Sequence, residues 1–212
     1  MANNFSPFGF VPVNTSGGPM NWRISTRRIQ STNATPLNKG DVTQAVIPAN
    51  GYITRGVAAD FNAPGTTMTG IFWGCQYLSI SQKRVVWSQN WPGNGDANGD
   101  IIAYTIDDPN ARFLVQTGTA GFQISGTPNA FGSSPVGQYC TFDVGTPNPN
   151  TGISGMFADS VAATATYPFI ITAMYLDPPG ANGTDATSLY NYVEVGFNNE
   201  WLRTNSAVLG IA

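Results

Sequence analysis

Carboxylates are the first residues to consider for chemistry, because the 212-residue chain contains no histidine. Without histidine, Ser–His, Cys–His and His–metal mechanisms are all excluded. The adjacent pair Asp107-Asp108 could in principle act as a general acid and base. However, neighbouring residues point apart on a strand or turn, and Pro109 follows at once, so we expect a structural turn. The sequence therefore predicts no catalytic residues and no enzyme.

A second candidate site is a cation-binding loop at Asn94–Asp100. Its oxygen-bearing side chains fall at positions 1, 3, 5 and 7 of a calcium loop, and Gly99 falls at position 6. Position 12 would be Thr105, where such loops use a bidentate glutamate. Because Asn, Asp and Gly are also typical turn residues, an ordinary loop is favoured. We expect no metal and no cofactor, since the chain also has no Gly-rich phosphate loop followed by lysine.

The two cysteines, Cys75 and Cys140, both lie in apolar runs typical of strands. We favour buried thiols over a disulfide for a chain that folds in a reducing cytosol. Three tryptophans, Trp87, Trp91 and Trp201, could stack on sugar rings if they are exposed. Packing in a core or an interface explains them equally well, so both interpretations stay open.

The candidate residues described above lie in or next to stretches that we expect to form β-strands. The central feature is a β-hairpin at 70–93, in which two β-branched and aromatic runs flank the polar link 79–83. The first run has bulky side chains on both parities, which indicates a strand buried on both faces or packed beneath a loop. Further strands are expected at 41–47, 51–55, 100–106, 112–116, 136–144, 168–176 and 190–197.

High glycine and proline contents and the lack of an amphipathic helix favour many short strands joined by turns. We therefore expect an all-β fold, an antiparallel β-barrel or sandwich with long loops and an extended N-terminal arm. The predicted division places the N-terminal arm at residues 1–38 and a single barrel or sandwich domain at 39–212.

The N-terminal arm has no alternating pattern of its own, yet it contains Phe5, Phe8, Phe10 and Trp22. Aromatic side chains without their own core need a surface to lie on. That surface could be the chain's own barrel or a neighbouring subunit, and the sequence favours neither.

Charge is scarce and unevenly distributed. Charged residues make up 10% of the chain, against about 25% in typical soluble domains. Such a deficit is typical of a chain that works inside an assembly, although a secreted Gly/Asn/Thr-rich β-protein would share it. Residues 1–40 carry a net charge of +4 and residues 41–212 carry −7. The overall −3 argues against nucleic-acid binding, and we expect neither a secretory signal nor a membrane span.

Several of these stretches together resemble a family of tailed-bacteriophage virion proteins, the capsid decoration or cement proteins. The resemblance extends over about residues 1–200 and is carried by Gly40-Asp-Val42, Gly51-Tyr-Ile53, GIFWGCQYLS, VVWSQNWPG and AYTIDDPNARFLVQ. It implies a small β-rich structural protein, made in the host cytoplasm, that binds the outer surface of the assembled capsid. The implied partners are the major capsid protein and further copies of the chain, commonly as a homotrimer that cements neighbouring capsomers. No catalytic residues belong to that family.

On this hypothesis the N-terminal arm crosses onto the capsid or a neighbouring protomer, with aromatic residues filling grooves and basic residues meeting acidic groups. The alternative function is a carbohydrate-binding β-sandwich, such as an adhesin or a tail-associated lectin module. Another virion component, a tail or head-fibre subunit, is a third possibility. The candidate interface residues are Phe5, Phe8, Phe10, Trp22, Arg23, Arg27 and Arg28.

Overall fold

The computed structural model describes residues 4–13, 22–46, 51–61, 68–93, 95–118, 122, 135–175 and 187–200. Apart from the short 3-10 helix η1 (Ala58–Phe61), the regular elements of this part are strands, and all paired strands are antiparallel. The strands are β1 (Val11–Val13), β2 (Ile24–Ile29), β3 (Leu37–Asn38), β4 (Val42–Ala45), β5 (Ile53–Arg55), β6 (Met68–Ser79), β7 (Arg84–Ser88), β8 (Asn90–Trp91), β9 (Ile101–Ile106), β10 (Arg112–Gln116), β11 (Tyr139–Asp143), β12 (Phe157–Ala162), β13 (Phe169–Tyr175) and β14 (Tyr192–Phe197). The predicted all-β fold is confirmed: the sheets are antiparallel and do not close into a barrel, which is consistent with a sandwich.

Sheet A contains six strands in the order β1-β10-β14-β13-β11-β12. Side chains alternate along each strand, and one face is apolar, with Phe113, Val193 and Val195 fully buried. An isolated bridge between Thr117 and Ala158 brings the end of β10 toward β12. Sheet A therefore curves strongly around its core without closing into a barrel.

Sheet B has the order β2-β9-β6-β4-β5, and β7 pairs with the second half of β6. The predicted central hairpin is thus confirmed as β6–β7. The short ribbon β3–β8 contributes Leu37 and Trp91 to a second core on the inner face of this sheet. The buried members of that core are Ile29, Leu37, Ile53, Phe72, Cys75, Trp91, Ala97, Ile101 and Ala103.

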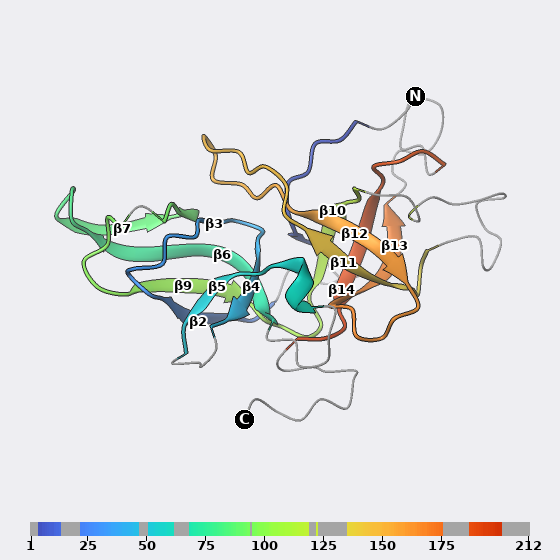
Figure 1. Ribbon diagram of the computed structural model, residues 1–212, viewed down its shortest axis with the longest axis horizontal. Helices are drawn as coiled ribbons and strands as arrows, with labels where there is room; N and C mark the ends of the chain where they lie inside the picture. Colours follow the sequence, from blue (N-terminus) through green and yellow to red (C-terminus); the bar gives the residue numbers. More distant parts are fainter. Residues whose placement is uncertain are drawn as a thin grey trace.

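The two sheets lie side by side along the long axis of the molecule, with sheet B on the left of Figure 1 and sheet A on the right. The two sheets contact each other where one end of the outer face of sheet B packs into the core of sheet A. Along β9, Ile106, Tyr104 and Ile102 share that face. Ile106 is fully buried in the core of sheet A, whereas Ile102 is 43% exposed. Within the described residues, no other segment packs on the rest of the outer face of sheet B.

Much of the N-terminal arm is built into these sheets. Strand β1 pairs with β10, β2 pairs with β9 over six residues, and β3 pairs with β8. The predicted division at residue 38 comes directly after β3. Residues 24–38 thus belong to sheet B and the ribbon that covers its inner face.

Candidate functional site

Four large apolar side chains are exposed together on the outer face of sheet B. Leu78 pairs with Val85, while Gln76 pairs with both Trp87 and Ile102, so these residues point to the same side. The exposed fractions are 41% for Leu78, 58% for Val85, 54% for Trp87 and 43% for Ile102. We call these four residues the uncovered face. A sheet face this apolar is normally covered, by the chain itself or by a partner.

The backbone beneath Trp87 is adapted to its indole ring. A Cβ atom added at Gly74 would lie 2.8 Å from Cζ2 of Trp87, so only glycine lets the ring lie against β6 at this point. The Tyr104 hydroxyl donates a hydrogen bond of 3.1 Å to Oε1 of Gln76, which is the cross-strand neighbour of Trp87. Trp87 is therefore held in place on the sheet although half of its surface is exposed.

The uncovered face ends near a pocket at the junction of the two sheets. The pocket has a volume of about 310 Å³ and is mostly apolar, with Phe8, Val11, Trp22, Trp73, Lys39 and Gln89 among its lining residues. Trp22 and Trp73 meet edge to face at 6.2 Å between ring centroids. The Lys39 ammonium lies 3.8 Å from the centroid of Trp73, a cation–π contact. Gln89 and Lys39 are polar groups that a ligand in this pocket could contact.

The four aromatic candidates of the N-terminal arm lie against the chain's own sheets. Phe10 is 1% exposed and stacks on Phe169 at 4.6 Å. Because Phe10 is core, it cannot contact a capsid in the folded protein.

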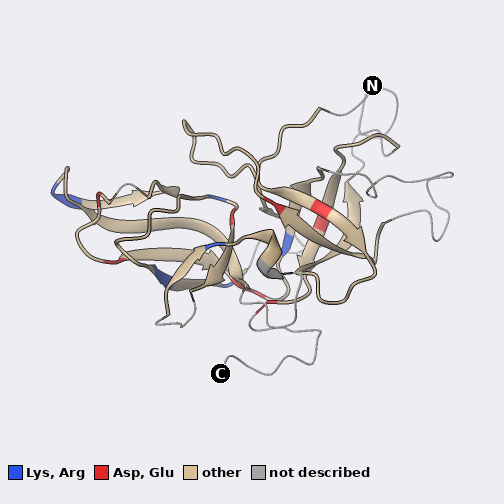
Figure 2. Ribbon diagram, viewed as in Figure 1, with Lys and Arg blue, Asp and Glu red and all other residues tan. Residues whose placement is uncertain are grey.

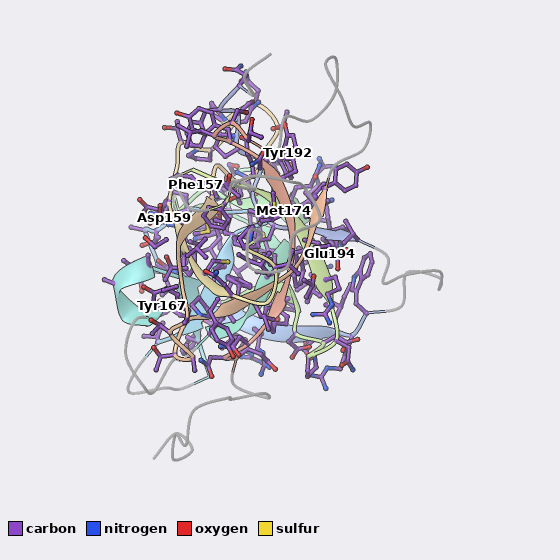
Figure 3. All side chains as sticks on the ribbon, turned by 90° about the vertical axis from the view of Figure 1, so that its right-hand side faces the viewer. Phe157, Asp159, Tyr167, Met174, Tyr192 and Glu194 are labelled. Atoms are coloured by element: carbon purple, nitrogen blue, oxygen red, sulfur yellow. The ribbon has the colours of Figure 1, made fainter. Side chains whose placement is uncertain are left out.

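Phe5 and Phe8 pack against Phe157 and Tyr192 of sheet A, which lie near each other in Figure 3. Phe5 contacts Phe157 at 5.2 Å, and Phe8 stacks on Tyr192 at 5.8 Å. Trp22, which packs against Trp73, is partly buried. The sequence allowed these aromatic rings to lie on the chain's own sheets or on a neighbouring subunit, and in the structure they lie on the chain's own sheets.

Two of the three candidate arginines are paired with the buried carboxylate of Asp107. Arg23 Nε lies 2.9 Å from Oδ1 and an Arg27 guanidinium nitrogen lies 3.0 Å from Oδ2, while Ser25 also donates to Oδ1. The hydrogen bond to Asp107 raises the pKa of Arg23. Arg28 is 70% exposed and lies 3.8 Å from Asp100. The arginines of the arm thus meet acidic groups of their own chain.

Asp107 and Asp108 have separate structural roles, and the predicted turn involves Asp108. The Asp108 side chain accepts a hydrogen bond of 2.9 Å from the Asn110 backbone N–H, closing the turn.

We expect Asp107→Asn to lower the free energy of unfolding by about 1–3 kcal/mol, because the charge-assisted bonds to two arginines are lost. Asp108→Asn retains the turn acceptor and should change it by less than about 0.5 kcal/mol. Urea unfolding at neutral pH measures both, and equal effects would contradict this assignment.

The loop at 95–100 uses its carboxylates for hydrogen bonds within the chain. Asp96 accepts from the Ser79 hydroxyl at 2.7 Å and from the Ser81 backbone at 2.9 Å, and the bond from Ser79 lowers the pKa of Asp96. Asp100 accepts from the Tyr52 hydroxyl at 2.6 Å. Among the described residues, no three acidic or cysteine side chains gather in a way that could hold a metal ion. Asn94 lies outside the described residues.

The cysteines are free and buried, as predicted, in the cores of different sheets. Burial raises the pKa of Cys75 to about 12 and also raises the pKa of Cys140. For Trp91, the sugar-stacking interpretation is wrong, because this residue is fully buried and its indole N–H donates to the Asn33 carbonyl. Trp87 is exposed, and Trp201 lies outside the described residues.

A buried carboxylate that the sequence does not single out, Asp41, joins two loops. It accepts a hydrogen bond of 2.7 Å from the Asn38 backbone and another from Ser154, near the charge of Arg55. Burial outweighs these favourable contacts and raises the pKa of Asp41 above its ordinary value of 3.8. Folding therefore makes Asp41 easier to protonate than it is in the unfolded chain.

A raised pKa in the folded state means that stability is lost as pH rises through that pKa. We expect Asp41→Asn to remove this loss while keeping an acceptor for Asn38. The stability that the variant gains over the unchanged protein should therefore be larger at about pH 7.5 than at about pH 4. Urea unfolding midpoints at the two pH values measure this difference. A difference that shrinks as pH rises would show that Asp41 is held as a carboxylate.

The chain matches no known family model, no curated protein and no solved structure. Within the part of the chain that the structure describes, there is no helix of sufficient length and apolarity to span a membrane.

Proposed function

We propose that the protein is a structural component of a bacteriophage virion that binds the outer surface of the capsid and links neighbouring capsomers. The observation that supports this best is the uncovered face of sheet B. Leu78, Val85, Trp87 and Ile102 form an apolar surface on a regular sheet. Exposed apolar patches of this kind mark sites of protein–protein contact.

The low charge of the molecule fits the same proposal. Figure 2 shows a ribbon that is mostly neutral, with Lys, Arg, Asp and Glu as scattered segments. Interface cores are depleted of charge and enriched in aromatic residues. Binding would bury apolar surface at about 25 cal/mol per Å², before the costs of association are subtracted.

The structure changes which residues we expect at the capsid. Phe10 is core, and Arg27 is mostly buried beside Asp107. Phe5, Arg23 and Arg28 retain exposed surface of 41%, 52% and 70%. We therefore propose that the uncovered face makes the main contact and that the arm contributes only through these exposed groups.

The proposal is tested by co-sedimentation of the purified protein with capsids that lack it. The expected result is saturable binding to a fixed number of sites on each capsid. Recovery of the protein entirely in the supernatant would contradict the proposal.

A second candidate function, carbohydrate binding, is supported by the pocket at the junction of the sheets. Trp22, Trp73 and Phe8 offer aromatic surfaces, and Gln89 and Lys39 offer hydrogen-bond donors beside them. Sugar sites combine such rings with a few placed polar groups. Binding to glycans without binding to capsids would favour this candidate over the first.

A further inference from the structure

Strand β7 forms a free edge of sheet B. It is paired with β6 on one side, and within the described chain no strand pairs with its other side. In Figure 1, β7 lies at the upper left border of the molecule. A free edge presents backbone N–H and C=O groups that a further strand can pair with.

The other edge strands of sheets A and B are protected, and β7 is not. Strand β1 contains Pro12, β2 contains Arg27 and Arg28, β5 has three residues that end in Arg55, and β12 contains Asp159 beside a bulge. Prolines, charges, bulges and shortness are the devices that prevent edge-to-edge pairing. In β7 the central residues are Val85, Val86 and Trp87, and its one charge, Arg84, is at the first position.

The sequence of β7 is complementary to itself in the antiparallel direction. The register that pairs all five residues places Val86 opposite Val86, Val85 opposite Trp87 and Arg84 opposite Ser88. Aromatic and β-branched side chains are favourable cross-strand neighbours. This register brings no two like charges together, since Lys83 would come opposite Gln89. The same register keeps the two uncovered faces on one side of the joined sheet.

We propose that two copies of this chain associate through β7, pairing antiparallel about Val86. A second copy is the partner because pairing about Val86 places apolar residues opposite apolar residues at the three central positions of β7. The two copies of sheet B then form one continuous sheet, and Val85 of each copy packs against Trp87 of the other. This inference concerns the isolated protein and does not depend on the proposed capsid binding; it predicts a dimer where the family resemblance implies a homotrimer.

A charge-swap experiment tests the pairing. One double variant carries Val85→Lys and Trp87→Lys, and the other carries Val85→Asp and Trp87→Asp. Both positions are exposed, so the fold should be retained, which circular dichroism checks. Light scattering after size exclusion is expected to give a dimer for the unchanged protein, a monomer for each variant, and a dimer again for the equimolar mixture. A variant with Leu78→Lys and Ile102→Lys, which lie on the same face but not on the edge strand, should remain dimeric.

A second measurement tests the register. Val86→Cys places a thiol opposite its own copy, at a Cβ separation of about 4.5–5.5 Å for directly opposed residues. Mild oxidation should therefore link this variant into a covalent dimer, while Val57→Cys, which is exposed elsewhere, should stay unlinked. A monomeric unchanged protein, or an oligomer that none of the charge variants alters, would overturn the inference.

Discussion

Removal of residues 1–38 is expected to prevent folding, and not merely to weaken binding to a partner. The deletion takes away β1, β2 and β3, and with them Phe10 from the core of sheet A and Ile29 and Leu37 from the core of sheet B. Loss of one large buried side chain costs about 2–5 kcal/mol. Whole domains are stable by only about 5–15 kcal/mol, so losing three exceeds what the fold can tolerate.

The single substitution Phe10→Ala measures the same dependence in a protein that still folds. Its ring stacks on Phe169 at 4.6 Å and meets Phe142 edge to face at 6.4 Å. We expect the free energy of unfolding to fall by about 3–5 kcal/mol. Phe5→Ala, at a 41% exposed position on the same segment, is the control and should cost about 1 kcal/mol or less. Equal and small effects would show that the segment is not anchored through Phe10.

Capsid binding is expected to be lost when the uncovered face is made polar away from β7. The double variant Leu78→Asn and Ile102→Asn removes two exposed apolar side chains and leaves the edge strand unchanged. Each such side chain contributes about 1.5–3 kcal/mol when fully buried, so affinity for the capsid should fall about 100-fold or more. Stability should change little, because both residues are exposed in the isolated protein.

Val57→Asn is the matched control for this experiment. Val57 is 49% exposed and apolar, but it lies outside the uncovered face, next to η1. Its substitution should leave capsid affinity unchanged. If Val57→Asn weakened binding as much as the double variant did, loss of any exposed apolar side chain would weaken binding, and the uncovered face would not be the specific contact. Full binding by the double variant would move the capsid contact to another surface.

Strands β10, β11, β13 and β14 and the central hairpin β6–β7 were predictable because their apolar runs are long and end at clear turn residues. The expected strand at 190–197 corresponds to β14, and 112–116 coincides with β10. The turn that begins at Asp108 was also predictable, since Pro109 and Asn110 are turn residues. The sequence did not show that this turn leads from β9 in sheet B to β10 in sheet A.

The strands of the arm were not predictable, because a strand that adds to an existing sheet needs little apolar pattern of its own. In β2, Thr26 and Arg28 face outward while Arg27 meets Asp107, a partner eighty residues away in the chain. No local signal shows that Asp107 satisfies that arginine. Strand β12 was missed for the same reason, since Asp159 and Ser160 interrupt its apolar residues.

The candidate site was likewise only partly predictable from the sequence. The exposure of Trp87 could not be separated from the burial of Trp91 by sequence, because both lie in one aromatic run and only the ribbon β3–β8 decides which is covered. Gly74 is the one local sign, since it leaves room for an indole ring on the neighbouring strand.

The most direct test of capsid decoration is cryo-electron microscopy of capsids that lack the protein, mixed with the purified chain. We predict ordered density at symmetry-related positions on the outer shell, with the uncovered face of sheet B turned toward the capsid. Unbound capsids, or bound copies whose uncovered face points to solvent, would contradict the account.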